Sequence, residues 1–365
     1  MTGLGVLDFD DMISNLTITG FRAFRELRVD PLTRVNLFVG KNNAGKTSIL
    51  EAVELTALGT PNALTRSLSR RGEEVALNGE ELDPSHLFQG HKLNLGRTFS
   101  ITAEGEATSW IECKVSHGSN QYGDPGQPSL FGIEDIQSSP ILGIVFKSHA
   151  TATPRFLPLS ADAGLPQRRL SPFLPSEEVP VNFIGTGLVG AFKLGQLWDS
   201  LVLTPEEQEV ISALRIIEPG IERIAFLTEN RRSLGSIFFK HAGSDQRLPL
   251  GSFGDGAKRL LALTLNLLSA RRGFLLVDEI DTGLHHTVLM DMWKLVIQTA
   301  KRLDVQVFAT THSLDCVHAL AWVQEQNPDL AAEVTLHRVE KDAPATVVYN
   351  MDEIAIAERG QIEVR

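Results

Sequence analysis

Hydrophobic and polar positions alternate with a period of two in the first part of the chain. The alternation runs through residues 15–39 in three stretches separated by polar breaks and Pro31, and it predicts β-strands. A glycine-rich turn begins at Gly40. From Lys46 to Leu58 the apolar residues follow the spacing of a helix. The order strand, loop, helix is therefore predicted for this part of the chain.

Residues 61–245 follow a less regular pattern. Pro, Gly and Ser cluster at 116–140 and 158–180, and short β-like stretches lie at 98–102, 110–115, 141–146 and 181–184. Thr204, Pro205 and the acids after them predict the start of a helix that reaches about residue 217. Strand-like residues follow at 221–227 and 236–239. We expect an antiparallel β-rich insert with a helical part.

The last third of the chain has the most regular pattern. Helices are predicted at 256–270, 284–302 and 314–324, and they alternate with strands at 274–277 and 305–309. This alternation favours an α/β fold with a mostly parallel sheet. We therefore expect three segments, which are a first part of the core at 1–60, the insert at 61–245 and a second part of the core at 246–365.

Composition narrows the class of protein without naming a function. The 365 residues include 42% hydrophobic and 22% charged residues, which is typical of a globular protein. The 34 basic and 45 acidic side chains give a net charge of −11, so the overall field does not attract DNA or membranes. Cys113 and Cys316 lie far apart and suggest neither a disulfide framework nor a zinc site. Without a secretory signal or an apolar run that could span a bilayer, we expect a cytoplasmic protein.

The strongest chemical signal is the unbroken pattern G-x-x-x-x-G-K-[ST] at Gly40–Thr47, between a predicted strand and a predicted helix. Glycines allow backbone N–H groups to surround phosphate oxygens, and the helix N-terminus adds attraction. Lys46 supplies a cation for the β- and γ-phosphates, and Thr47 offers a hydroxyl to Mg²⁺. The expected nucleotide-binding residues are Gly40, Lys41, Asn42, Asn43, Ala44, Gly45, Lys46, Thr47 and Ser48.

Polar side chains end the two apolar strands of the last third. The run 274–277 is followed by Asp278 and Glu279, at the edge where α/β sheets bind ligands. We expect Asp278 to hold Mg²⁺ with Thr47, and Glu279 to polarise the attacking water as a general base. His312 follows the next strand, where it could contact the γ-phosphate or the water. Glu279, Lys46 and His312 are thus the catalytic candidates.

A short glycine-rich segment opens the helix that precedes Asp278. It contains Ser252, Gly254, Asp255 and Gly256, and small residues with a hydroxyl at a helix N-terminus can bind an anion. An ordinary helix cap formed by Ser252 or Asp255 is the alternative interpretation.

These elements, in this order, resemble the ABC-type ATPases, and within them the SMC, RecF and overcoming-lysogenization-defect (OLD) branch. The segment 18–24, with its Phe-Arg pair, resembles the opening strand of that branch. The similar motifs are Walker A at 40–47, the signature loop at 252–256, Walker B at 274–279, the D-loop at 281–285 with Asp281, and the histidine switch at 310–313. The resemblance covers roughly residues 15–60 and 245–325. It implies the P-loop NTPase fold and Mg²⁺-dependent ATP hydrolysis.

The resemblance also implies a homodimer in which each ATP lies between the Walker A loop of one copy and the signature loop of the other. The signature reads S-x-G-D-G, so either Ser252 or Gly254 takes the position of the family's serine. Gln89 is the candidate for the Q-loop residue. Isolated subunits would hydrolyse ATP slowly, because the γ-phosphate would lack part of its donors.

The resemblance leaves several biological roles open, and these differ in the partner of the ATPase. About 50 residues follow His312, too few for the TOPRIM nuclease domain of OLD proteins, so we expect an ATPase that acts on a separate effector, a nuclease or toxin, in anti-phage defence. The alternative is a RecF-like repair ATPase that clamps DNA. A transporter ATPase fits less well, because the signature departs from that of transporters. The arginine pairs at 70–71, 168–169, 231–232 and 271–272 could touch phosphates if the fold gathers them, although a solvated surface is the default interpretation.

Overall fold

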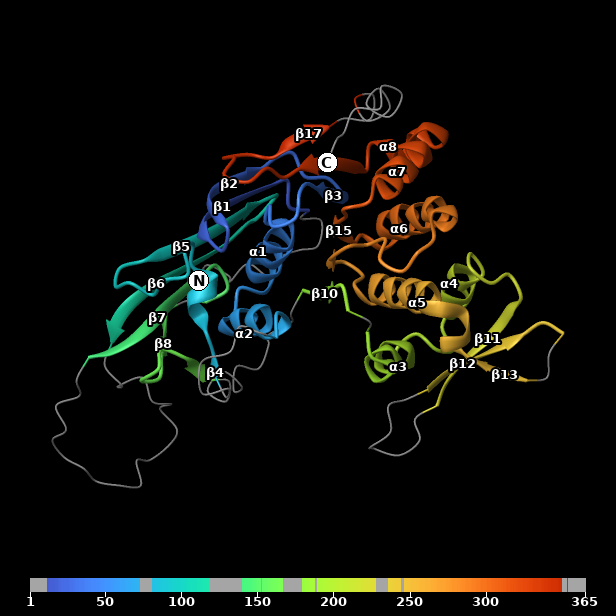
Figure 1. Ribbon diagram of the computed structural model, residues 1–365, viewed down its shortest axis with the longest axis horizontal. Coiled ribbons are helices and arrows are strands. Elements are labelled where there is room, and N and C mark those ends of the chain that lie inside the picture. Colours follow the sequence, from blue (N-terminus) through green and yellow to red (C-terminus); the bar gives the residue numbers. More distant parts are fainter. Residues whose placement is uncertain are drawn as a thin grey trace, which may run out of the picture.

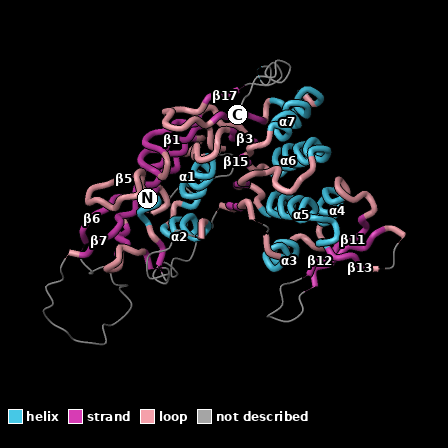
Figure 2. Tube along the Cα trace, in the orientation of Figure 1, coloured by secondary structure: helices cyan, strands magenta, loops and turns pink. Residues whose placement is uncertain are grey.

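The computed structural model describes residues 12–72, 81–118, 140–151, 153–166, 179–187, 189–227, 236–243, 246–349 and 353. Two large sheets form the body of this part of the chain, with helices between them and outside one of them (Figures 1 and 2). No helix of the described ranges is both long and apolar enough to cross a membrane.

The core sheet has six strands in the order β10, β14, β15, β3, β16 and β17. The first five strands run parallel, and the last pairs antiparallel with β16. This arrangement confirms the mostly parallel sheet that the sequence predicts. In sheet order the strands span Val181–Ile184, Phe274–Val277, Gln306–Thr310, Val35–Val39, Val334–Arg338 and Val347–Tyr349.

The central strands of this sheet are buried on both faces, so they appear in the sequence as continuous apolar runs. In β14, Leu275 and Val277 point into one hydrophobic cluster while Phe274 and Leu276 point into another. Because each face packs its own core, truncation of Leu276 to alanine should cost about 2–5 kcal/mol of unfolding free energy.

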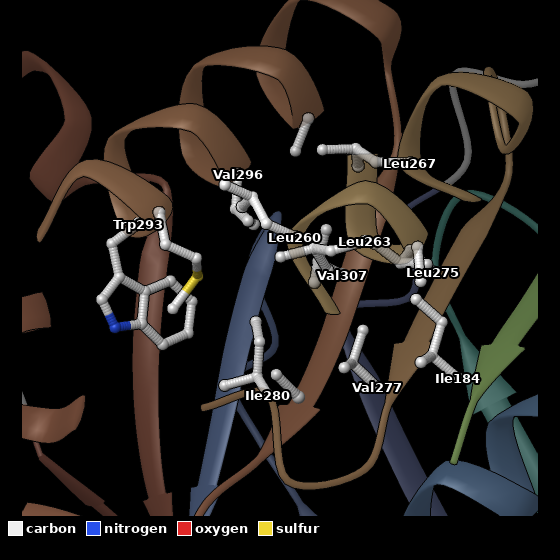
Figure 3. Close-up of a cluster of buried hydrophobic side chains, with 14 of the residues drawn as sticks. Ile184, Leu260, Leu263, Leu267, Leu275, Val277, Ile280, Trp293, Val296 and Val307 are labelled. Atoms are coloured by element: carbon white, nitrogen blue, oxygen red, sulfur yellow. The ribbon is translucent and has the colours of Figure 1, made fainter. Parts of the chain in front are cut away.

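Three helices cover one face of the core sheet. Figure 3 shows Leu260 and Leu263 of α5 lying near Leu275 and Val277 of the sheet, with Trp293 of α6 beside them. The Trp293 indole Nε1 donates a hydrogen bond of 3.0 Å to the carbonyl oxygen of Cys316, which ties α6 to α7. These helices span Gly254–Ser269 (α5), Leu289–Leu303 (α6) and Leu314–Gln326 (α7), and the short α8 follows at Pro328–Ala331.

The other face of the core sheet packs on α1 (Lys46–Leu58), which separates it from an antiparallel sheet (Figure 1). The helix α2 (Pro61–Arg70) continues beside α1. The antiparallel sheet has the order β2, β1, β5, β6, β7 and β8. These strands span Phe24–Val29, Asn15–Phe21, Thr98–Glu104, Thr108–Gly118, Ile141–Ser148 and Arg155–Pro158, and the short pair β4 and β9 spans Glu81–Leu82 and Leu165–Pro166.

A smaller lobe packs against α5 at the far end of the molecule (Figure 1). It contains a three-stranded antiparallel sheet and two short helices. Its elements are α3 (Ala191–Asp199), α4 (Glu206–Leu214), β11 (Ile221–Leu227), β12 (Ser236–His241) and β13 (Arg247–Pro249), followed by a 3-10 turn at Leu250–Phe253.

The structure divides the chain differently from the three segments expected. The strand β10, which we assigned to the insert, pairs in parallel with β14 and belongs to the core sheet. Conversely, β1 and β2 from the first segment join the insert strands, because β1 pairs antiparallel with both β2 and β5. The helix expected at 284–302 begins later, at Leu289, because residues 281–285 form a loop. The helix α3 had not been predicted.

Candidate functional site

The glycine-rich loop connects the end of β3 to the start of α1. Gly40 and Gly45 have φ angles of 142° and 99°, in the region that favours glycine. A Cβ atom on Gly40 would lie 2.4 Å from the Val339 carbonyl oxygen, and one on Gly45 would lie 2.4 Å from the Phe24 ring. The loop can therefore close tightly only with glycine at both positions. The first N–H groups of α1, which have no acceptor inside the helix, are left to bind an anion.

Lys46 extends back along this loop. Its Nζ donates hydrogen bonds to the carbonyl oxygens of Gly40 at 2.8 Å and Lys41 at 3.0 Å, and it lies 3.4 Å from His312 Nδ1. Burial lowers the pKa of Lys46 to about 8, although the carboxylates that end β14 oppose the shift. Burial also lowers the pKa of His312, and the Lys46 ammonium acts in the same direction. Among the described residues the ammonium has only these uncharged hydrogen-bond partners, and a phosphate would supply an anionic one.

Asp278 follows β14 and meets the start of α1. Its carboxylate accepts hydrogen bonds from Thr47 Oγ1 at 3.0 Å and 3.2 Å, and from Thr310 Oγ1 at 2.6 Å. Its own N–H donates to the Ile184 carbonyl oxygen at 2.8 Å, which fixes the residue at the sheet edge. The carboxylate and hydroxyl oxygens form a donor set suited to a hard divalent cation.

Glu279, the next residue, has a strained backbone with φ of 48°. Its N–H donates a 2.8 Å hydrogen bond to Thr310 Oγ1, and its Oε2 accepts one of 3.2 Å from Thr282. A non-glycine residue in this region costs about 1–3 kcal/mol and persists where its surroundings hold it. The backbone conformation thus fixes the orientation of the carboxylate.

Arg259 on α5 holds this strained turn through hydrogen bonds to its backbone carbonyls. Only 4% of the residue is exposed. Its guanidinium donates to the carbonyl oxygens of Asp278 at 2.6 Å, Glu279 at 2.7 Å and Gly185 at 2.7 Å. Its only signal in the sequence is an arginine inside an apolar helix pattern, so this residue was not predicted.

These side chains border one cavity of about 580 Å³, a size typical of small-molecule sites. Five Walker A residues and Ser48 line it, together with Asp278, Glu279 and His312. Gly40 and Lys41 contribute the carbonyls that hold Lys46, and Ala44 is buried. The Walker A residues on the wall are Asn42, Asn43, Gly45, Lys46 and Thr47, and the other wall residues are Ser48, Arg22, Ala23, Arg71, Gln89, Gly90, His91, Lys341 and Asp342.

A buried ion-pair cluster lies behind the helix end of this cavity. Glu51 is fully buried, and its carboxylate lies 2.7 Å from Arg22 Nε and 3.0 Å from both Arg71 Nε and Arg71 Nη2. A solvated surface was the default expectation for the 70–71 pair, but Arg71 reaches the cavity. The charged residue at position 51, within the apolar spacing of its helix, was the available signal.

Gln89 also reaches the cavity wall. The Arg97 guanidinium donates to the Gln89 side-chain oxygen at 2.8 Å and to its backbone carbonyl. Among the arginine pairs, 168–169 and 231–232 lie outside the described residues. Arg271 and Arg272 are exposed.

The expected signature residues lie away from the cavity. Ser252, Gly254 and Asp255 are exposed and are not among the residues that line it. A Cβ on Gly256 would lie 2.8 Å from the carbonyl oxygen of Gly283, so the start of α5 packs against the loop expected as the D-loop. In that loop, Asp281 accepts a 2.5 Å hydrogen bond from Thr311.

Two family models match this chain. Residues 12–60 match an AAA ATPase domain, and residues 181–315 match an AAA domain described as "putative AbiEii toxin, Type IV TA system". The two ranges carry the Walker A loop and the acids at the end of β14, respectively.

The chain is similar in sequence to proteins of two kinds. It is 23% identical over 358 residues to the ATP/GTP phosphatase of Helicobacter pylori, and the match covers 91% of this chain and 93% of that protein. It is 31% identical over 127 residues to the DNA replication and repair protein RecF of Lactobacillus acidophilus. That match covers 34% of this chain and 32% of RecF, so the chain spans about a third of the length of RecF.

Its fold is similar to that of a solved SMC head bound to the C-winged helix domain of ScpA. The TM-score is 0.53 at 13% identity, and the match covers 92% of this chain and 96% of that one. The chain is therefore an ATPase with the α/β fold of P-loop NTPases, similar in part of its sequence to RecF and in its fold to SMC heads.

Proposed function

We propose that this chain is a switch that dimerises around ATP and separates after hydrolysis. Each ATP would lie between the Walker A loop of one copy and the signature loop of the other. The observation that supports this most directly is the separation of the Walker A cavity from the exposed segment that resembles a signature loop. One cavity is lined by Lys46, Asp278 and Glu279, whereas Ser252 is exposed and does not line it.

The cavity residues suit the separate tasks of this reaction. Lys46 and the first N–H groups of α1 bind the phosphates, and Thr47 and Asp278 would hold Mg²⁺, which screens the charge of the triphosphate. Glu279 orients and deprotonates the attacking water, because its carboxylate is presented by a fixed backbone. His312 donates to the γ-phosphate from the end of β15.

The second copy would complete the site through its signature loop. Ser252 is the loop residue that offers a side-chain hydroxyl, and it precedes α5, whose N-terminus adds a favourable dipole. Gly254 has φ of 78°, a conformation that glycine adopts without strain. We therefore assign the family's serine role to Ser252, and Gly254, Asp255 and Gly256 to backbone contacts. Asp281 belongs to the loop against which the start of α5 packs, through the close approach of Gly256 to the Gly283 carbonyl.

The test is the oligomeric state of Glu279→Gln with saturating Mg·ATP, measured by light scattering. Loss of the base should trap the ATP-bound state at twice the mass of one chain. The matched control is Glu279→Gln combined with Lys46→Ala, which should stay monomeric because it cannot hold the phosphates. A monomeric Glu279→Gln protein with bound ATP would rule out the switch.

We further propose that the switch controls a separate effector, a nuclease or toxin, in the cytoplasm of a cell under phage attack. The support is the resemblance to OLD-like ATPases and the match of residues 181–315 to a domain described as a putative toxin. Co-purification of a nuclease or toxin with Glu279→Gln, and its release by hydrolysis in the wild type, would support this role. Recovery of the chain without any partner in both states would count against it.

A RecF-like role on DNA is the second candidate. It is favoured by the identity of 31% to RecF over 127 residues. If it is correct, Glu279→Gln with ATP should retain duplex DNA, and retention should weaken steeply as salt rises. Equal binding with and without ATP, or no retention at low salt, would exclude it.

A further inference from the structure

Two charged side chains on the cavity wall have no part in the phosphate chemistry described above. Lys341 and Asp342 form the exposed turn between β16 and β17. Both line the cavity that holds Lys46 and Asp278. Within the described ranges neither side chain forms a hydrogen bond or an ion pair with another residue. Their polar atoms are therefore available to a ligand.

The strand order places this turn at the end of the cavity opposite the reacting phosphate. The strands β14 and β15, which carry Asp278, Glu279 and His312, lie on one side of β3 and its phosphate-binding loop. The strand β16 lies on the other side of β3, and the Val339 carbonyl contacts the start of the loop. A triphosphate with its γ end at the acids therefore extends its base away from them.

Backbone pairing brings the same turn beside β2. The Arg28 N–H donates to the Pro344 carbonyl at 2.8 Å, and the Thr346 N–H donates to the Arg28 carbonyl at 3.0 Å. The bridge between Arg28 and Ala345 is parallel. Because the two segments run parallel, residues that precede Ala345 lie beside residues that precede Arg28. The turn therefore lies beside the start of β2, close to Ala23 on the cavity wall. The Ala23 side chain and two charged groups thus meet at the end of the cavity where the base belongs.

We propose that the Lys341–Asp342 turn reads the purine base, and that Asp342 admits guanine, so that the chain hydrolyses GTP as well as ATP. A carboxylate is an acceptor with two oxygens, and guanine presents two neighbouring donors, N1–H and the N2 amino group. The Lys341 ammonium donates to guanine O6. Adenine has no donor at N1 or C2, so its recognition depends less on Asp342.

This proposal rests on the proposed nucleotide site, and the reaction is the same in kind. Water attacks the γ-phosphorus of GTP, the bond to the β-phosphate oxygen breaks, and GDP and inorganic phosphate leave. The positions of Lys46, Asp278 and Glu279 relative to the phosphates do not depend on the base. The two purine nucleotides therefore differ only at the Lys341–Asp342 end.

The test is steady-state hydrolysis of ATP, GTP and XTP by the wild type and Asp342→Asn. Loss of a charge-assisted pair should lower kcat/KM for GTP by about 10- to 100-fold and leave ATP within about threefold. XTP carries an acceptor at C2 in place of the amino group, so an asparagine amide should bind it. Asp342→Asn should therefore hydrolyse XTP at least about tenfold better than the wild type does.

Glu340→Gln is the matched control, because Glu340 lies in the same turn, pairs with Arg338 and does not line the cavity. It removes the same charge and should change none of the three rates. Parallel changes in ATP and GTP turnover, no gain with XTP, or a wild type inactive on GTP would overturn the assignment of Asp342. Wild-type ATP turnover in the same assay shows separately whether the nucleotide site works.

Discussion

Nucleotide affinity should fall as pH rises through about 8, because the free site holds Lys46 with a lowered pKa. Burial lowers that pKa to about 8. A bound triphosphate would surround the ammonium with negative charge and raise its pKa again. The bound state then holds more protons than the free state above pH 8, so binding takes up a proton and weakens with rising pH.

The magnitude follows from the fraction of Lys46 that is already charged. With a free-site pKa of about 8, the dissociation constant is multiplied by roughly 1 + 10^(pH − 8) relative to a fully charged lysine. The factor is about 1.1 at pH 7, about 2 at pH 8 and about 11 at pH 9. We expect affinity to weaken about tenfold between pH 7 and pH 9, with uptake of about half a proton at pH 8.

The assay is titration calorimetry with a non-hydrolysable ATP analogue in two buffers of different ionisation enthalpy at each pH. His312→Gln is the control, because burial lowers the pKa of His312 and its titration falls below this window. That variant should keep the same slope. Constant affinity from pH 7 to 9, or release of protons on binding above pH 8, would refute the reasoning about Lys46.

Three substitutions test the parts that support the site. Glu51→Gln leaves Arg22 without its buried carboxylate and should lower the free energy of unfolding, measured with urea, by about 3 kcal/mol or more. An unchanged urea midpoint would contradict the ion-pair cluster. Gly45→Ala places a Cβ against the Phe24 ring at a φ of 99° and should abolish nucleotide binding. Normal binding by a folded variant would contradict the requirement for glycine at this position. Thr310→Val removes the hydroxyl that bonds the Asp278 carboxylate and the Glu279 N–H. In a Mg²⁺ titration it should lower kcat roughly tenfold and leave ATP affinity nearly unchanged. A wild-type kcat would refute the role of Thr310.

The sequence was most informative where function and local structure depend on the same short segment. Gly40–Thr47 contains its own turn residues, its lysine and its helix start. The acids of β14 and the histidine after β15 could also be placed together, because parallel strands end at a common sheet edge. The mostly parallel core follows from the same alternation of strands and helices.

Local sequence patterns do not predict which distant segments of the chain pair with one another. Val181–Ile184 has the appearance of an insert strand, but the core sheet recruits it beside β14. The turn at Lys341–Asp342 reaches the cavity wall because β16 pairs with β3. Arg259 likewise acquires its role only because α5 packs under the end of β14. Each of these features depends on long-range contacts.

The most direct test of the proposed chemistry is single-turnover release of the γ-phosphate from Mg·ATP by the wild type and Glu279→Gln, with nucleotide binding measured on the same samples. If Glu279 is the base, the rate should fall by about 100-fold or more while binding stays within about twofold. Release at the wild-type rate by a Glu279→Gln protein that binds ATP normally would contradict the assignment of this cavity as the hydrolytic centre.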